Sequence, residues 1–550
     1  MNELTGKSMK VHQAIARALT DNGVDTMFGL CGDANMFMVD SFVHDCGGTF
    51  VSSSHEVGAA LMALGYASTA DKVGICSVTF GPAMTNTVTA LVEAVKGQIP
   101  MVVIAGDTNK EEREINQNLA QRDIAVSTGA GFEQVRSPRT AVEDVARALR
   151  RAMVEYRPIV LNVPFEFDWA EIEYQPVRAY VPDGRAVIGA SEDLDNAIGI
   201  IASARRPVIV AGRGATSPED RAALLRLAAR IEAPVATTIK AKDLFRGEAY
   251  NLGLCGTFST PVGVEILMES DCIITFGASL TMFTTSMGTF RKGKRIIQVN
   301  LELAEIGKNF VPDAGLVGDP AGTADIIVKW LDEAEIPPSG WYSEDLRNRI
   351  ASYVPEPNAQ GDYDNGTIDI RNAMLRLDAE LPADRVLVTD KGRFMIHAWP
   401  LLSVPDPKSF LPSGHIGSIG MGFAYAVGAA FAAPGRPIIC VLGDGGFMHG
   451  GLAEYNTAVR YKLDVITIVC NDSAYGAEIS KFEDKYQDRE MDPETIAFDW
   501  PDFAPVAIAL GGEGVTVRSQ ADLTIAMEAV RDRSRPLLID LKLDPARIRL

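Results

Sequence analysis

The sequence lacks the cysteine arrangements that build zinc sites or disulfide frameworks. Its seven cysteines are scattered, none forms a Cys-x-x-Cys pair, and several lie inside apolar runs. Such cysteines are typical of buried free thiols in a reducing compartment. The sequence also has no apolar run of 18 residues and no apolar signal core after Met1. We therefore expect a soluble, cytoplasmic protein.

Clusters of basic residues are also missing. The 550-residue chain has 72 acidic and 52 basic residues, which gives a formal net charge of −20. Nucleic-acid binding needs clustered Lys and Arg, and an acidic surface is repelled by anionic membranes. We therefore expect no nucleic acid and no membrane as partners. The segment Gly212-Arg213-Gly214 lacks the full Gly-x-Gly-x-x-Gly spacing, so it predicts no dinucleotide site.

What the sequence does contain is a repeated alternation of short β-rich runs with amphipathic helical patterns. This alternation occurs in three blocks, residues 1–185, 186–335 and 366–550. A segment rich in Pro, Gly and acidic residues, 336–365, separates the last two blocks and is predicted to be a linker. Alternating strands and helices are typical of parallel sheets covered on both faces. The predicted fold is α/β, with three doubly wound parallel-sheet domains.

Two acidic residues follow neighbouring predicted strands in the third block. Asp444 comes after the apolar run 437–442, Asp472 comes after the run 465–470, and the helical segment 451–462 lies between them. A strand–helix–strand crossover normally gives two parallel strands, and open α/β sheets bind ligands at the carboxyl ends of such strands. Two carboxylates there, with the backbone N–H groups of Gly445 and Gly446, suit a divalent cation carrying a diphosphate.

Two other segments, at Glu56 and at 413–422, allow a structural or a functional interpretation, and a third predicts only a loop before a helix. Glu56 is predicted at the start of a Gly/Ala-rich helix, 57–67, where an acidic residue is favoured by the helix dipole alone. The pair Gly81-Pro82 opens another predicted helix. The segment 413–422 packs four glycines before a helix, which allows either close helix–sheet packing or the approach of backbone to a ligand.

Taken together, these segments resemble the thiamine-diphosphate (ThDP) enzymes of the acetolactate synthase, benzoylformate decarboxylase and pyruvate decarboxylase superfamily. The resemblance covers nearly the whole chain. It is carried by Phe28-Gly-Leu30, Ser54-His-Glu56, Gly81-Pro-Ala-Met-Thr-Asn86, Gly417-Ser-Ile-Gly-Met-Gly422, and Gly443-Asp-Gly445 with Asn471-Asp472. The resemblance implies that the three blocks are an N-terminal pyrimidine-binding domain, a middle domain and a C-terminal domain for the diphosphate and Mg²⁺.

The resemblance also implies the roles of individual residues. Asp444, Asp472 and the carbonyl group of Ala474 would hold Mg²⁺. Most members have asparagine where Asp472 stands, and the spacing to Tyr475-Gly476 favours Asp472 over Asn471 as the ligand. Glu56 would be the catalytic residue that bonds the pyrimidine, and Ile419 would hold the cofactor bent. The other implied cofactor-binding residues are Pro82, Asn86, Gly392, Gly417, Ser418, Gly443, Gly445, Gly446, Tyr475 and Gly476.

The activity implied is that of a ThDP- and Mg²⁺-dependent 2-oxoacid decarboxylase and carboligase of the acetolactate synthase type, a lyase or transferase. A C2-enamine would be protonated or transferred to a carbonyl acceptor. In this superfamily Glu56 and the metal site belong to different subunits, so a homodimer is the minimum and a homotetramer is common. FAD is not expected, because Asn471-Asp472 followed by Ser-x-Tyr is similar to FAD-free catabolic acetolactate synthases.

Several alternatives stay open. One is a benzoylformate-decarboxylase-like enzyme of aryl or branched 2-oxoacids, another is a ThDP-dependent C–C lyase or hydrolase, and a third is a catalytically silent ThDP-binding protein. The adjacent histidines of pyruvate-decarboxylase-like members are absent from the segment 109–117, which disfavours aldehyde release by their route. Gln117 and Gln121 are weaker candidates for substrate contact. The sequence does not identify the 2-oxoacid or the acceptor.

Overall fold

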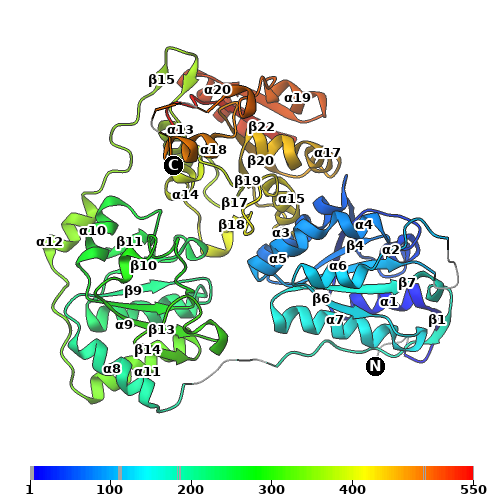
Figure 1. The fold of residues 1–550 in the computed structure, drawn as a ribbon, viewed down its shortest axis with the longest axis horizontal. Helices are drawn as coiled ribbons and strands as arrows, with labels where there is room; N and C mark the ends of the chain where they lie inside the picture. Colours follow the sequence, from blue (N-terminus) through cyan, green and yellow to red (C-terminus); the bar gives the residue numbers. More distant parts are fainter. Residues whose placement is uncertain are drawn as a thin grey trace.

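The computed structural model describes residues 5–109, 114–182, 184, 188–486, 488–489 and 491–548. Within these residues the chain forms three six-stranded sheets, and all the strand pairs inside each of them are parallel. Figure 1 shows three lobes, coloured blue to cyan, green, and yellow to red. The prediction of three parallel-sheet α/β domains is confirmed. None of the described helices combines the length and apolarity needed to cross a lipid bilayer.

The first domain has the strand order β3-β2-β4-β5-β7-β6. The strands are β3 (Thr49–Ser52), β2 (Thr26–Gly29), β4 (Gly74–Val78), β5 (Met101–Asp107), β7 (Pro158–Pro164) and β6 (Gly131–Gln134), and β1 (Ser8–Lys10) pairs with β8 (Glu171–Glu173) in a separate antiparallel ribbon. Its helices are α1 (Val11–Asp21), α2 (Met36–His44), α3 (Glu56–Ala70), α4 (Pro82–Asn86), α5 (Val88–Gly97), α6 (Gln121–Ser127) and α7 (Ala141–Glu155). The central strands are buried on both faces, which is why they are continuous apolar runs.

The middle domain has the strand order β11-β10-β9-β12-β13-β14. The strands are β11 (Asn251–Leu254), β10 (Val235–Thr237), β9 (Pro207–Ala211), β12 (Cys272–Phe276), β13 (Arg295–Asn300) and β14 (Ala314–Val317), and the helices are α8 (Glu192–Ser203), α9 (Pro218–Ile231), α10 (Pro261–Glu269) and α11 (Pro320–Glu333). The predicted boundary at 185–186 lies outside the described residues.

The predicted linker, 336–365, contains an ordered helix. Helix α12 (Glu344–Ala351) is capped by Ser343, whose hydroxyl oxygen accepts from the N–H of Leu346 at 3.1 Å. Leu346 is buried in an apolar cluster with Ile266 of the middle domain, and Arg349 is paired with Glu269. The chain then runs along the outer edge of the molecule to the short hairpin β15 (Asp362–Tyr363) and β16 (Thr367–Ile368) (Figure 1). The first part of this segment is therefore docked on the middle domain.

The third domain has the strand order β18-β17-β19-β20-β22-β21. The strands are β18 (Phe410–Pro412), β17 (Val386–Thr389), β19 (Ile438–Gly443), β20 (Val465–Asn471), β22 (Leu537–Lys542) and β21 (Glu513–Val517), and the helices are α13 (Ile370–Glu380), α14 (Met395–Leu401), α15 (Gly422–Ala432), α16 (Asp444–Gly446), α17 (Leu452–Arg460), α18 (Gly476–Glu483), α19 (Phe503–Ala509) and α20 (Gln520–Asp532). Helix was predicted from residue 451, but helical structure begins at Asp444, because a π-helical turn over Phe447–Gly451 joins α16 to α17.

The first and third domains meet where α3 crosses α15. Every residue of α3 from Gly58 to Ala67 is buried, and one apolar core includes residues of both helices. A Cβ atom at Gly65 would lie 2.2 Å from the carbonyl oxygen of Tyr425, and one at Gly428 would lie 1.9 Å from that of Met62. The two backbones therefore touch, which explains why both helices are rich in Gly and Ala.

Candidate active site

The carboxylates of Asp444 and Asp472 lie at the same edge of the third sheet. Asp444 follows β19 and Asp472 follows β20, and these two strands are adjacent and parallel. The residues are only 3% and 8% exposed. Burial and then the charge of Asp472 raise the pKa of Asp444 to about 7, and burial also raises the pKa of Asp472. Two buried carboxylates that repel each other have the chemistry of a cation site.

The loop after β20 orients this pair. Ser473 has a left-handed backbone (φ 54°), and the next N–H, that of Ala474, donates to Asp444 Oδ2 at 3.1 Å. The Asn471 amide is used elsewhere, because its Nδ2 donates to Asp540 Oδ1 at 2.9 Å and its Oδ1 accepts from the N–H of Ser473 at 3.2 Å. This geometry supports Asp472 rather than Asn471 as the metal ligand, and the assignment stays a prediction.

The carboxylate of Asp472 also has a cationic partner that sequence reasoning missed. Arg393 Nε donates to Asp472 Oδ2 at 2.7 Å, and Arg393 Nη2 lies 2.6 Å from the same oxygen. Arg393 is 4% exposed, and its Nη1 donates to the carbonyl oxygen of Ile548 at 2.8 Å. The only sequence signal was its position directly after Gly392, since Asp472 lies 79 residues further along the chain.

A second missed residue, Asp390, ties the glycine loops of this edge together. It directly follows β17 and is fully buried, and burial raises its pKa to about 6. Its Oδ2 accepts from the N–H of Gly420 at 2.6 Å, and its Oδ1 accepts from the N–H of Lys391 at 2.8 Å. A Cβ atom at Gly446 would lie 2.6 Å from Oδ2. Asp390 therefore brings the loops before Gly392, after Gly417 and around Gly445 to one place.

Three further predicted residues meet beside this edge. A Cβ atom at Gly445 would lie 2.5 Å from Tyr475 Cε1 and 3.7 Å from Ile419 Cδ1, so the two side chains approach the glycine from outside. A Cβ atom at Gly476 would lie 2.0 Å from Arg393 Nε, so Gly476 leaves the space that the guanidinium group fills. Close contacts with neighbouring side chains are therefore sufficient to explain why residues 445 and 476 are glycines, whether or not a ligand binds there.

Glu56 lies at the corresponding edge of the first sheet. It is the first residue of α3, as predicted, and His55 caps the helix by accepting from the N–H of Val57. The Glu56 side chain is 13% exposed, and its Oε2 accepts from Asn86 Nδ2 at 3.0 Å. The structure therefore brings together two residues predicted to contact the cofactor.

The turn before Asn86 is supported by Gln121. Gly81 has a positive φ of 68°, and Pro82 begins α4 directly after it. The N–H of Gly81 donates to Gln121 Oε1 at 2.8 Å. Gln121 Nε2 donates to the carbonyl oxygen of Gly106 at 2.7 Å and to Asn162 Oδ1 at 2.6 Å. Gln121 is 3% exposed and fully used inside the domain, so the structure favours a supporting role over substrate contact.

Glu56 makes no direct polar contact with the two aspartates among the described residues of one chain. The polar contacts of Glu56 run to Asn86 and His55, and over the described ranges no hydrogen bond or ion pair joins Glu56 to Asp444 or Asp472. Nor do those ranges contain a group of three or more His, Cys, Asp or Glu side chains arranged for a metal ion. The pair of aspartates therefore needs further oxygen ligands, which Mg²⁺ usually takes from backbone, water and phosphate.

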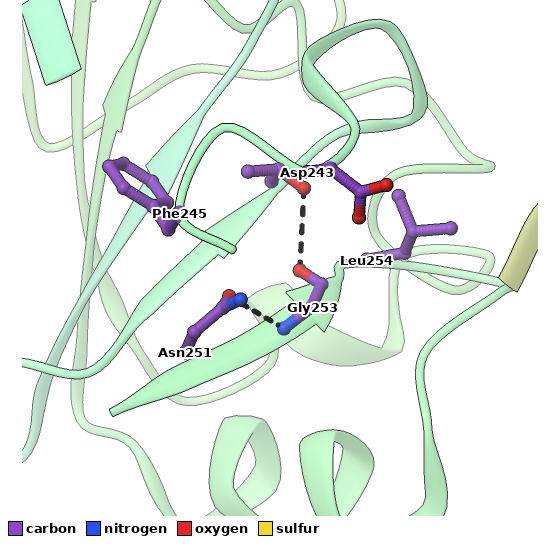
Figure 2. Close-up of a pocket in the computed structure, with 6 residues that line it drawn as sticks. Asp243, Phe245, Asn251, Gly253 and Leu254 are labelled. Atoms are coloured by element: carbon purple, nitrogen blue, oxygen red, sulfur yellow. Dashed lines mark hydrogen bonds between the residues drawn. The ribbon is translucent and has the colours of Figure 1, made fainter. Parts of the chain in front are cut away.

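Two hollows are described, one in the first domain and one in the middle domain. One, of about 500 Å³, opens at the carboxyl ends of the first sheet and is lined by residues that include Asp33, Phe37, Phe80, Gln117, Phe165 and Trp169. The other, in the middle domain, has only about 10 Å³, which is room for about one water molecule. In it Asn251 Oδ1 accepts from the N–H of Gly253 at 2.9 Å, and Asp243, Phe245 and Leu254 complete the wall (Figure 2). Its size excludes a substrate.

The chain matches three family models in the order of its three domains. They are described as the thiamine pyrophosphate enzyme N-terminal TPP binding domain (residues 9–128), central domain (194–327) and C-terminal TPP binding domain (390–541). Thiamine pyrophosphate is another name for ThDP. The boundaries predicted from the sequence, 1–185, 186–335 and 366–550, stay predictions in their detail.

Similar proteins match along nearly the whole chain. A probable acetolactate synthase large subunit of Methanococcus aeolicus is 27% identical over 97% of this chain and 92% of its own length. The acetolactate synthase isozyme 2 large subunit of Escherichia coli is 27% identical over 97% and 95%. An acetolactate synthase of Mycobacterium bovis is 27% identical over 98% and 88%. With three matched domains in order and these relatives, the chain belongs to the thiamine pyrophosphate enzyme family and is a ThDP-dependent enzyme of the acetolactate synthase type.

Proposed function

We propose that this protein is a ThDP- and Mg²⁺-dependent 2-oxoacid decarboxylase and carboligase. The observation that carries the proposal is the buried pair of carboxylates, Asp444 and Asp472, at the edge where the glycine loops converge. Arg393 compensates for the charge of Asp472, and burying the second carboxylate, that of Asp444, beside it stays costly unless a further cation binds. The donor set of two carboxylates and the Ala474 carbonyl has the hard oxygen character that Mg²⁺ requires.

Most of the predicted residues then have a role that their position supports. Asp444, Asp472 and Ala474 would hold Mg²⁺, and the loops of Gly392, Gly417–Ser418, Gly443, Gly445–Gly446 and Gly476 would line the diphosphate. When bound, ThDP supplies an electron sink for the carbanion that decarboxylation leaves. Asn86 donates to one oxygen of Glu56, which leaves the other oxygen to hold a proton at the pyrimidine. Ile419 would hold the cofactor bent, and Tyr475 would contact the cofactor beside Gly445, since a Cβ atom at Gly445 would touch both side chains.

We also propose that the protein is a homodimer at minimum, and that it forms a homotetramer, as is common in this superfamily. The support is that no hydrogen bond or ion pair among the described residues joins Glu56 itself to Asp444 or Asp472 within one chain. A partner subunit could therefore contribute the missing half of each site. Light scattering coupled to size-exclusion chromatography would test this part, since a monomeric and fully active protein would contradict it.

FAD is not part of the proposed function. The glycines of Gly212-Arg213-Gly214 have a packing reason, because a Cβ atom at Gly212 would lie 2.4 Å from the carbonyl oxygen of Gly277. The Arg213 side chain is used between domains, where Nη1 donates to the carbonyl oxygen of Gly97 at 2.5 Å. These contacts explain the glycines and the arginine of this segment without a bound nucleotide. Flavin absorbance in the purified protein would overturn this part.

The 500 Å³ hollow favours a second candidate within the same chemistry. Its lining by Phe37, Phe80, Phe165 and Trp169 suits an aryl or branched side chain on the 2-oxoacid. It also lies beside the Gly81–Pro82 turn, since a Cβ atom at Gly81 would be 2.3 Å from the carbonyl oxygen of Gln117, which lines the hollow. This supports the benzoylformate-decarboxylase-like alternative alongside pyruvate as substrate.

One experiment tests the proposal and separates the two candidates. The purified protein is stripped with a chelator, and carbon dioxide release is measured with pyruvate, a branched 2-oxoacid and an aryl 2-oxoacid. We expect release only when ThDP and Mg²⁺ are both restored, and a fall of about 10²-fold or more in the Glu56→Gln variant. Glu344→Gln is the matched control, because Glu344 also begins a capped helix. Unchanged turnover in Glu56→Gln would contradict the mechanism.

A further inference from the structure

Arg393 forms a buried ion pair inside the proposed metal site. Its guanidinium group contacts Asp472 Oδ2 through both Nε, at 2.7 Å, and Nη2, at 2.6 Å. The two residues are 4% and 8% exposed. Removing one partner of a buried ion pair leaves an uncompensated charge, so the two residues depend on each other.

The guanidinium group of Arg393 has N–H groups that no hydrogen bond of the described structure uses, among them those of Nη2. Nε is used by Asp472 and Nη1 by the carbonyl oxygen of Ile548, at 2.8 Å. Nη2 is buried, and no hydrogen bond of good geometry engages it within the described structure, despite the short distance to Asp472. Nη2 carries two N–H groups, and Asp472 Oδ2 faces at most one of them, so at least one N–H group is left for an anionic oxygen.

The surroundings of Arg393 are those proposed for the diphosphate. Arg393 directly follows Gly392, and a Cβ atom at Gly476 would lie 2.0 Å from its Nε and 2.6 Å from its Nη2. A side chain at residue 476 would therefore push the guanidinium group away from Asp472. Gly392 and Gly476 are both among the residues predicted to contact the cofactor, so Arg393 lies between two of the proposed cofactor-binding loops.

We propose that Arg393 is a cofactor-binding residue that works as one unit with Asp472. Arg393 holds the Asp472 carboxylate in place and balances its charge beside Asp444, and an unused N–H group of its Nη2 binds a phosphate oxygen of an organic diphosphate. Arginine suits this task, because its planar fork can serve a carboxylate and a phosphate at once. The inference rests on the proposed function and adds to it a residue that no motif indicated.

The competing explanation is that Arg393 only fastens the C-terminal segment through Ile548. Both explanations predict that Arg393→Gln lowers stability, so stability alone does not separate them. The affinity of the folded protein for the cofactor does. A fastening residue leaves that affinity unchanged, whereas a cofactor-binding residue changes it.

The test uses the full-length protein freed of metal and cofactor, and it measures ThDP affinity by calorimetry at saturating Mg²⁺. We expect Arg393→Gln to weaken ThDP binding about tenfold to hundredfold, since a hydrogen bond to a charged group is at stake. Asp472→Asn should weaken it as well, and the double variant should lose less affinity than the sum of the two single losses, because the two residues are coupled. Additive losses, or unchanged affinity in Arg393→Gln, would overturn the inference.

Two further variants keep the test decisive. Arg385→Gln is the matched control, because Arg385 is a 2% exposed arginine of the same domain that donates to the carbonyl oxygen of Ser403. The Arg385→Gln variant should lose stability and keep its ThDP affinity.

The Arg393→Lys variant covers the case in which Arg393→Gln does not fold. We expect Arg393→Lys to fold and to bind ThDP more weakly than the wild-type protein, and a wild-type affinity would overturn the inference. If the wild-type protein itself bound no Mg²⁺ and ThDP, the proposed function would fail instead.

Discussion

The backbone N–H of Ser54 donates to both carboxylate oxygens of Glu454, at 3.2 and 3.3 Å. Ser54 stands two residues before Glu56, and Glu454 lies on α17, the helix that continues from Asp444. Glu454 is 2% exposed and also accepts from the Thr457 hydroxyl group at 2.7 Å. Burial raises the pKa of Glu454. This contact links the segment that positions Glu56 to the helix that begins at the proposed metal site.

The first prediction concerns this link. Glu454→Ala leaves the N–H of Ser54 and the Thr457 hydroxyl group without their buried acceptor, so it should lower the free energy of unfolding by about 1–3 kcal/mol. Chemical denaturation of the metal-free protein measures this. Glu528→Ala, at an exposed position of α20, is the control and should stay within about 0.5 kcal/mol of wild type. Equal effects of the two substitutions would contradict the prediction.

The second prediction concerns the partner of Glu56. Asn86 is exposed and donates to Glu56 Oε2, so Asn86→Ala should leave the free energy of unfolding within about 0.5 kcal/mol of wild type. Turnover should fall about tenfold, because one oriented hydrogen bond to the Glu56 carboxylate is lost. Thr85→Ala, at the neighbouring exposed position, should keep full turnover. A fully active Asn86→Ala variant would show that Asn86 does not orient Glu56.

The third prediction concerns pH. Asp168 is 2% exposed, and burial raises its pKa to about 7. Between about pH 4 and pH 7 the folded protein keeps this proton and the unfolded chain does not, so stability should fall as pH rises through this range and then level off. Asp168→Asn removes the titration. Its free energy of unfolding relative to wild type should therefore rise by roughly 2–4 kcal/mol from pH 5 to pH 8. A pH-independent difference would contradict this.

The fourth prediction concerns the crossing of α3 and α15. Gly428→Ala places a methyl group 1.9 Å from the carbonyl oxygen of Met62, and Gly65→Ala places one 2.2 Å from that of Tyr425. Both backbones would have to separate, so each variant should lose more than about 2 kcal/mol of stability. Gly199→Ala, in the open on α8, is the control and should gain about 0.4–1 kcal/mol. Thermal unfolding measures all three.

Local patterns were sufficient to predict the elements that carry the site. The runs before Asp444 and Asp472 are strands because both are continuous apolar segments, and such segments form the centre of a covered parallel sheet. Glu56 begins a helix because a strand ends shortly before it and Gly/Ala-rich sequence follows. The adjacency of β19 and β20 followed from the single helix between them.

The missed residues depend on contacts between distant segments. Arg393 could not be assigned from the sequence, because its role depends on a carboxylate in another loop and on the side chain of residue 476 being absent. Asp390 directly follows β17, but its bond to Gly420 depends on how two loops fold back on each other, which no local pattern indicates. The early helix start at Asp444 was missed because two glycines there indicate a loop by propensity, and tertiary packing overrides that preference.

The contact of α3 with α15 has a mechanical consequence. Side chains absorb small displacements by changing rotamer, but main chain pressed against main chain has no such freedom. A displacement of one helix should therefore be transmitted almost fully to the other. Glu56 is the first residue of α3, and the glycine loop 413–422 leads directly into α15. A displacement of the segment that carries Glu56 would therefore displace the glycine loop 413–422 as well, and the reverse.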